Sequence, residues 1–390
     1  MPFEMPCARS NARIGSVLLS CLLLVACAAP PVQRPDFLLQ DELFGAPSEP
    51  IRVEDVFALS DEMRHYARAE IAGQLRANDR NRGLFDALYR KGQLKLEYDS
   101  AVTRNAAQAF AARAGNCLSL VIMTAAFARE LGVEFQYQAA INDAAWSRSG
   151  SLYLRNGHIN LMLGSGLRAV GNSRFDPPLM IDFLPPEELR GLRTRPIGEH
   201  RVIAMFMNNR ATESLVDGRL DDAYWWARGA IGNDAAFLKT YNTLGVIYHR
   251  HKDLQQAERA FRYVLAREPA NAAALANLAQ LERQQGHNAE ADALDRELAQ
   301  VERNPPFHFF NLGLKAMENG DFKAARDLFA KEVDRDPYNH EFHFWLALAD
   351  FRLGDIARAR SQLALALENS TTRGDRDLYA AKLAWLRAQR

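Results

Sequence analysis

Residues 241–248, Tyr-Asn-Thr-Leu-Gly-Val-Ile-Tyr, place a single glycine, Gly245, among bulky side chains. Small residues recur every 34 residues in two series: Gly245, Ala279, Gly313 and Ala347 in the first, and Ala257, Ala291, Ala325 and Ala359 in the second. A small residue in each of two antiparallel helices lets the helices pack closely, whereas a larger residue would force them apart. The period therefore predicts a row of similar helix pairs, each packed on the next.

A period of 34 residues with small residues at these two places resembles the tetratricopeptide repeat. Carrying the phase backwards puts Ala211 and Ala223 at the two small positions of a degenerate first repeat. We therefore expect an all-α solenoid of five repeats over 204–373, followed by a solvating cap helix over 374–390. The resemblance implies a protein or peptide partner that is bound in a concave groove and not chemically changed there.

The first-helix positions that usually line such a groove change character along the chain. They are polar in one repeat (Lys239, Asn242, His249, Arg250) and apolar in the fourth (Phe310, Leu314, Met317) and fifth (Phe344, Leu348, Phe351). The sequence predicts a groove that is polar at one end and apolar at the other, unless the apolar residues pack against the cap helix or neighbouring repeats. His249 and His251 have no ligand partners at metal spacing, so we expect no metal, and nothing in the sequence calls for a cofactor.

The region 51–200 combines helical and strand patterns. Apolar residues at spacings of three and four predict helices over 53–75, 82–96 and 104–113, with Ser60 and Thr103 as caps. The apolar run 118–131, ended by Gly132, predicts a central buried helix. Strands are expected over 133–141, 152–154, 158–163 and 179–183. The pattern predicts an α+β domain.

Cys117 stands at the start of the buried helix, within Gly-Asn-Cys-Leu-Ser-Leu at 115–120. A helix N-terminus carries partial positive charge that favours a thiolate, the nucleophilic form of cysteine. His158 and Asp182 follow in an order that a Cys-His-Asp triad could use. The alternatives are a small buried core cysteine, a hydrogen-bonded strand histidine and an aspartate that forms a turn at the end of a strand.

The stretch 114–133 resembles the bacterial transglutaminase-like superfamily, and the resemblance extends over residues 99–182. Members that join this domain to tetratricopeptide repeats on a lipoprotein tend to show Tyr-Gln after the helix, a Trp before the His strand, and Asn-x-His-x-Asn. These features correspond here to Tyr137-Gln138, Trp146 and residues 156–160. The resemblance implies a papain- or transglutaminase-like fold.

The resemblance also implies that Cys117, His158 and Asp182 are catalytic. His158 would take the thiol proton and later protonate the leaving amine, while Asp182 would hold the imidazole tautomer. The backbone amide of Cys117 could contribute to an oxyanion hole, with Gln138 or Tyr98 as a second donor. One departure is that Asp182 lacks the Asp-Pro pairing common in the superfamily, which occurs upstream at Asp176-Pro177.

The N-terminus resembles a bacterial lipoprotein signal. Arg9 and Arg13 precede an apolar run over 14–25 that ends in Leu-Val-Ala-Cys at 24–27. In that resemblance residues 1–26 are a signal peptide and Cys27 carries the lipid. A membrane-spanning anchor is disfavoured because the run holds about twelve apolar residues, whereas a bilayer core needs roughly 20.

Processing of this kind leaves Cys117 without a disulfide partner, because Cys7 and Cys21 leave with the signal and Cys27 becomes a thioether. In the same resemblance, Ala28 and not Asp after the lipidated cysteine implies the outer membrane, with the folded part facing the periplasm. Residues 27–50 contain five prolines, which predict an extended tether.

Composition limits the partners. Lysine plus arginine and aspartate plus glutamate each number 48, so no net charge attracts nucleic acid, and membrane contact is expected through the lipid alone. Two functions remain open. One is a thiol-dependent peptidase, amidase or acyl transferase whose solenoid presents the substrate, and the other is a catalytically silent scaffold in an envelope complex.

Overall fold

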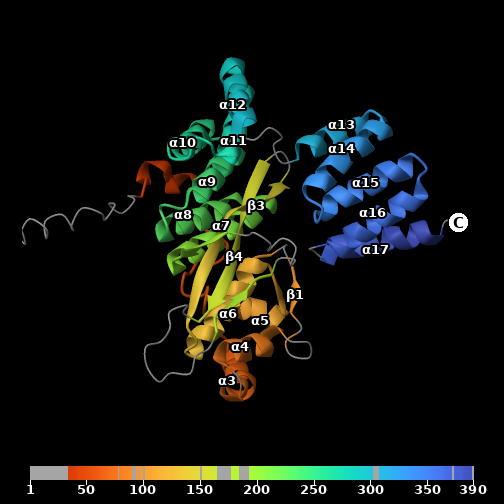
Figure 1. Cartoon of the computed structure of the whole chain (residues 1–390). Coiled ribbons are helices and arrows are strands. Elements are labelled where there is room, and N and C mark those ends of the chain that lie inside the picture. The colour runs from red at the N-terminus through yellow and green to blue at the C-terminus, as the bar shows by residue number, and fades with distance from the viewer. Residues whose placement is uncertain are drawn as a thin grey trace, which may run out of the picture.

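A computed structural model gives the fold of the chain (Figure 1). The structure describes residues 34–77, 79–89, 94, 96–99, 102–149, 152–164, 177–183, 193–301, 307–370 and 373–388. The expected signal peptide and Cys27 therefore lie outside the described residues. Within the described part of the chain, no helix combines the length and apolar character that crossing a membrane requires.

Helical segments precede the main sheet. One begins as α2 (Asp61–Tyr66) and continues through the π-helical η3 (Ala67–Ile71) into α3 (Ala72–Ala77), and α4 (Arg80–Tyr89), α5 (Ala106–Ala112) and α6 (Cys117–Glu130) follow. The first helix starts at Asp61 and not at Val53, because the Ser60 hydroxyl accepts a hydrogen bond from Met63 N over 3.2 Å and caps it. The predicted cap Thr103 is wrong, since α5 is capped by Asn105 in a capping box with Gln108.

The main sheet is antiparallel, with strand order β5-β4-β3-β6. Its strands are β3 (Phe135–Ser149), β4 (Leu152–Leu163), β5 (Leu179–Ile181) and β6 (Thr194–Ile197), while β1 (Glu97–Tyr98) and β2 (Ala114–Gly115) form a separate parallel pair. The two strands expected over 152–154 and 158–163 are one strand, β4. Strand β6 was not expected, because its sequence Thr-Arg-Pro-Ile contains a proline and a charge and suits only a sheet edge.

Five helix pairs follow in the described residues after 198, as the 34-residue period predicts, so the second half of the chain is a helical solenoid. The first helix begins at Glu199, five residues before the expected start. The pairs and the final cap helix are α7 (Glu199–Val216) with α8 (Leu220–Asn233), α9 (Leu238–His251) with α10 (Leu254–Leu265), α11 (Ala272–Gln284) with α12 (Asn288–Val301), α13 (His308–Glu318) with α14 (Phe322–Arg335), α15 (His340–Arg352) with α16 (Ile356–Glu368), and α17 (Arg373–Ala388).

Close packing within each pair explains the small residues. A Cβ added at Gly245 would lie 2.5 Å from Cε1 of Phe261, and one added at Gly313 would lie 2.5 Å from Cε1 of Phe329. Real Cβ atoms do not approach other atoms so closely. The ring in the second helix therefore uses the space that the glycine leaves in the first.

The solenoid forms two stacks. A single hydrophobic core runs from Leu38 through the α+β region to Leu298 on α12, whereas α13–α17 bury their apolar side chains in two further clusters. Among the described residues, α12 packs on α11 and α13 packs on α14, and Figure 1 shows α13–α17 as a separate group. Hence the boundary near residue 200 marks a change of architecture, and the core divides only after the third repeat.

The expected tether over 27–50 is wrong for residues 36–49, which lie against the first two repeats. This segment contains two short 3₁₀ turns, η1 (Asp36–Leu38) and η2 (Asp41–Leu43). Phe44 stacks on Tyr224 of α8 with ring centroids 4.0 Å apart, and Asp41 accepts hydrogen bonds from Tyr224 and Arg228. Burial of Leu38 and Phe44 outweighs the extended preference of the prolines.

The long β3–β4 hairpin packs on the first three repeats. Strand β3 contacts α7, and β4 contacts α9 and α11, the first helices of three successive pairs. Strand β4 also contacts α6 (Figure 1). The same strand therefore connects the helix that begins with Cys117 to the solenoid.

Candidate active site

Cys117 is the first residue of α6, and only the N-cap Asn116 separates it from β2. It is a free thiol and is partly exposed. The turn between β2 and α6 is tight, because a Cβ added at Gly115 would lie 2.7 Å from Cβ of Ser119. As the first residue of a helix, Cys117 carries a backbone N–H that has no acceptor within the helix. This position suits both a thiolate and the donor of an oxyanion hole.

His158 lies on β4 and Asp182 directly follows β5, the neighbouring strand. Nε2 of His158 is 2.8 Å from Oδ2 of Asp182, so the ring N–H donates to the carboxylate. Asn160, two residues along β4, donates from Nδ2 to the same oxygen over 3.0 Å. Residues two apart on a strand share a face, which is why His158 and Asn160 both reach Asp182.

Opposing effects act on the imidazole of His158, which is 8% exposed. Burial lowers its pKa, but hydrogen bonds and charge from Asp182 and Cys117 raise it, and the balance brings the pKa to about 9. Because Nε2 is engaged with Asp182, the hydrogen bond with the Cys117 thiol falls to Nδ1. The three predicted residues are thus brought together in the order Cys117, His158, Asp182.

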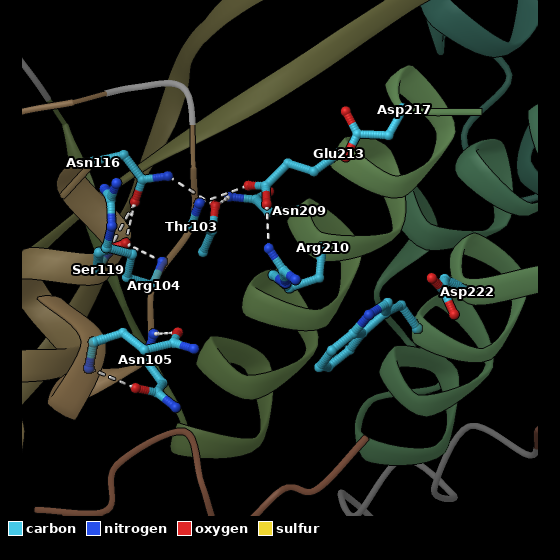
Figure 2. A network of polar contacts seen from close by, with 12 residues as sticks. Thr103, Arg104, Asn105, Asn116, Ser119, Asn209, Arg210, Glu213, Asp217 and Asp222 are labelled. Carbon is cyan, nitrogen blue, oxygen red and sulfur yellow. Dashed lines mark hydrogen bonds and ion pairs between the residues drawn. The ribbon is translucent and has the colours of Figure 1, made fainter. Parts of the chain in front are cut away.

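The N-cap of α6 is held by a polar network (Figure 2). Oδ1 of Asn116 accepts hydrogen bonds from the backbone N and the hydroxyl of Ser119, both over 2.9 Å. Nδ2 of Asn116 donates to Oγ1 of Thr103 over 2.8 Å, and Ser119 Oγ accepts from Arg104 N over 2.8 Å. These bonds fix the turn on which Cys117 stands.

The two side chains proposed as oxyanion donors, Gln138 and Tyr98, make different contacts. Oε1 of Gln138 accepts a hydrogen bond from the Thr194 hydroxyl over 2.8 Å, so this amide is oriented toward β6. Tyr98 pairs with Gly115 across the β1–β2 ladder, two residues from Cys117, and is 40% exposed. The side chains of Trp146 and Asn156, and Asp176 as a whole, lie outside the described residues.

The residues expected to line the groove have mostly structural partners. Phe310 is fully buried in the core of the fourth and fifth repeats, and Leu314 and Met317 pack against that core. Phe344 stacks on Tyr379 of the cap helix α17. In the polar repeat, Asn242 accepts a hydrogen bond from Asn277 over 3.1 Å, and His249 pairs with Gln284. The apolar first-helix residues of the fourth and fifth repeats therefore pack within the fold.

Sequence reasoning missed three residues of this site: Asn160, Asn116 and Thr103. Asn160 could have been found, because strand alternation places it on the face of His158 and because it belongs to the Asn-x-His-x-Asn stretch. Asn116 directly precedes the helix and is a preferred N-cap residue type. Thr103 gave no such signal, since its side chain acts through a contact with a residue thirteen positions away.

Comparison with known proteins identifies the repeats. The family model described as tetratricopeptide repeat matches residues 243–305 and 310–373. No curated protein sequence matches the chain significantly. The C-terminal region therefore contains tetratricopeptide repeats.

Solved structures resemble the repeats at low identity. A thermophilic tetratricopeptide-repeat protein of Thermus thermophilus, TTC0263, shares 18% identity over 46% of this chain and 99% of its own, with a TM-score of 0.33. YrrB, described as having an unusual peptide-binding site, shares 18% identity over 46% of this chain and 92% of its own, with a TM-score of 0.25. Yeast Tom70 shares 14% identity over 48% of this chain and 40% of its own, with a TM-score of 0.36.

Proposed function

We propose that this protein is an envelope lipoprotein with a transglutaminase-like cysteine hydrolase or acyl-transferase domain and repeats that bind a protein or peptide partner. The observation that carries the proposal is the hydrogen bond between His158 and Asp182 beside the start of the Cys117 helix. A nucleophile, a base and a group that orients the base are what acyl transfer from an amide requires.

In the resting pair the Cys117 thiol proton lies on Nδ1 of His158, and the reaction begins when the thiolate Sγ attacks an amide carbonyl carbon. The carbonyl oxygen becomes an oxyanion, which the backbone N–H of Cys117 would stabilise. Collapse breaks the carbon–nitrogen bond, and His158 returns the proton to the leaving amine, leaving an S-acyl enzyme. Water or a second amine, deprotonated by His158, then attacks the thioester and releases the thiol. Throughout, Asp182 orients and stabilises the imidazolium.

The raised pKa of His158 fits this scheme. Much of the rise comes from the neighbouring thiol and carboxylate, so the imidazolium is stabilised where a thiolate and an aspartate flank it. A thiolate–imidazolium pair is the reactive form of a cysteine of this kind.

The test is a stopped-flow reaction of the purified chain with an activated acyl ester such as p-nitrophenyl acetate. We expect a burst of p-nitrophenol equal to the enzyme concentration, and intact-mass detection of one acetyl group on Cys117. Cys117→Ala should abolish the burst, and Asp217→Asn on the surface next to α7 should keep it. A wild-type protein that gives no burst while its fold is intact would refute the enzymatic proposal.

The second candidate is a catalytically silent binding scaffold. It is favoured by the low exposure of His158 and by the way the α+β region shares one hydrophobic core with the first three repeats. Repeats of this family bind protein or peptide partners, and that role needs no reactive thiol. The burst experiment separates the two, because a scaffold has an inert Cys117.

Localisation forms part of the proposal: residues 1–26 are a signal peptide, and Cys27 anchors the chain to the outer membrane, facing the periplasm. Only residues 28–35 separate Cys27 from η1, and eight residues extend at most about 30 Å. The solenoid face that holds Phe44 and Asp41 would therefore lie close to the lipid surface. Labelling with a palmitate analogue should mark the wild type and not Cys27→Ala, and equal labelling of both would exclude lipidation at this sulfur.

A further inference from the structure

We propose that Glu213 and Asn209 of α7 are positioning residues for Cys117, and that they act through Thr103 and the N-cap Asn116. This inference rests on the proposed function, since it concerns how the nucleophile is held. It goes further by assigning a role in the active site to the first repeat of the solenoid, a part of the chain that otherwise serves partner binding.

Thr103 is one of the residues through which the α+β region contacts the solenoid. It is 1% exposed and lies between Asn116 and Glu213 (Figure 2). Its backbone N donates to Oε1 of Glu213 over 2.7 Å, and its hydroxyl also bonds to that carboxylate. The same hydroxyl oxygen accepts from Nδ2 of Asn116 over 2.8 Å and from Nδ2 of Asn209 over 3.3 Å.

These bonds form a directed chain. Because the Thr103 hydroxyl gives its proton to Glu213, its lone pairs are aimed at the amides of Asn116 and Asn209. With its NH₂ group engaged, Asn116 must present its oxygen to Ser119, whose backbone N–H it caps. The orientation of Glu213 therefore selects the Asn116 rotamer that starts α6 at Cys117.

Residues of the solenoid also hold the Glu213 side chain in position. Its other oxygen, Oε2, accepts from Nη1 of Arg210 over 2.8 Å, and Nη2 of Arg210 reaches Glu49 of the N-terminal segment over 2.8 Å. Glu49 also accepts from Nε1 of Trp226 on α8 over 3.2 Å. Burial raises the pKa of Glu213, although hydrogen bonds from Thr103 and the charge of Arg210 act against the rise. Glu213 is thus held by its hydrogen bonds at a place where burial disfavours its charged form.

The consequence for Cys117 is electrostatic. A thiolate at the first position of a helix is stabilised by the partial charge of the first-turn amides, and this effect falls off within one turn. Loss of the Asn116 cap would fray that turn and move the thiol relative to His158. Alkylation of Cys117 at neutral pH would then slow, while the hydrophobic core beneath α6 would stay in place.

The experiment measures iodoacetamide alkylation of Cys117 against pH in the full chain. The informative pair is Thr103→Val, which keeps the shape and the backbone bond to Glu213 but removes the hydroxyl, and Thr103→Ser, which restores it. We expect the midpoint of the Thr103→Val profile to rise by about one pH unit, and Thr103→Ser to return it toward wild type. Glu213→Gln and Asn209→Ala should each raise it by a smaller amount.

Asp217→Asn is the matched control, because Asp217 directly follows the same helix, is 58% exposed on its side chain and pairs with Arg219, away from Thr103. Circular dichroism melting identifies any variant that fails to fold, and the Thr103 pair then decides the outcome. A purely structural junction would lower the melting temperature without moving the midpoint, which would overturn the positioning role. A wild-type midpoint near the free-thiol value of about 8.5 would instead refute the proposed function itself.

Discussion

Nε2 of His158 lies 2.8 Å from Oδ2 of Asp182, and the two side chains come from adjacent strands at the open end of the Cys117 helix. The carboxylate also accepts from Asn160, so it cannot turn away from the ring without losing a second hydrogen bond. With Nε2 engaged by Asp182, Nδ1 is the ring nitrogen of His158 that is left for Cys117. The bond to Asp182 also fixes the orientation of the imidazole ring.

Removal of the carboxylate should reverse the shift in the His158 pKa. In Asp182→Ala, burial remains while a hydrogen bond and a negative charge are lost, so the pKa should fall from about 9 toward or below the ordinary 6.5. A pH titration of the ring protons by NMR measures it. Asp253→Ala, which removes the aspartate beside His251, should leave the His158 titration unchanged. An unaltered pKa in Asp182→Ala would show that the pair does not form in solution.

The same pKa predicts how stability depends on pH. Because the folded-state pKa of His158 lies above its unfolded value, the protonated ring stabilises the fold fully below about pH 6.5, and this contribution is lost as pH rises toward about 9. The free energy of unfolding in urea, compared between wild type and His158→Gln at pH 6 and pH 9.5, should differ more at pH 6. A difference that is constant or larger at high pH contradicts the assignment.

Gly313→Leu should destabilise the second stack. The new side chain meets the buried ring of Phe329, and overpacking of this kind costs typically about 1–3 kcal/mol before backbone strain. Gly232→Leu on α8 is the control, since a Cβ there meets no atom within 4 Å. Because α13–α17 have their own apolar clusters, Gly313→Leu should lower a melting transition without changing the alkylation of Cys117. Unchanged melting would mean that the repeat register is wrong.

Phe44 belongs to the N-terminal segment 36–49, but it should stabilise the first three repeats. It is 7% exposed and stacks on Tyr224, so Phe44→Ala should cost about 3 kcal/mol, as for a core phenylalanine. Phe37→Ala is matched in chemistry and nearby in sequence, but Phe37 is 61% exposed and the change should cost well under about 1 kcal/mol. Equal losses in urea unfolding would argue against the docked segment.

The features that the sequence predicts correctly are those set by residues close together in the chain. Gly245 and its counterparts predict the repeats because each helix pair imposes the same close contact again, and the contact pairs residues 16 apart, as with Phe261. The helix start at Cys117 follows from local composition in the same way. These features needed no knowledge of distant residues.

The parts that were missed depend on distant partners. Asp41 meets Arg228 across 187 positions and Thr103 meets Glu213 across 110, and no spacing rule connects such residues. The proline-rich composition before residue 50 favoured a tether, whereas Leu38 and Phe44 decide that the segment binds. The break after α12 likewise depends on contacts between repeats, which an uninterrupted 34-residue period does not encode.

Cys117 should react rapidly with an alkylating reagent at neutral pH. Its place at the start of α6 and its hydrogen bond with His158 both favour the charged sulfur, so iodoacetamide should alkylate it faster than a model thiol at pH 7. His158→Ala removes the positive partner and should slow the reaction and move its midpoint toward about 8.5. His249→Ala, on the solenoid helix α9, should leave the profile as it is. Two superimposable profiles for wild type and His158→Ala, both near the free-thiol value, would leave Cys117 as an ordinary helix-cap residue with no catalytic partner.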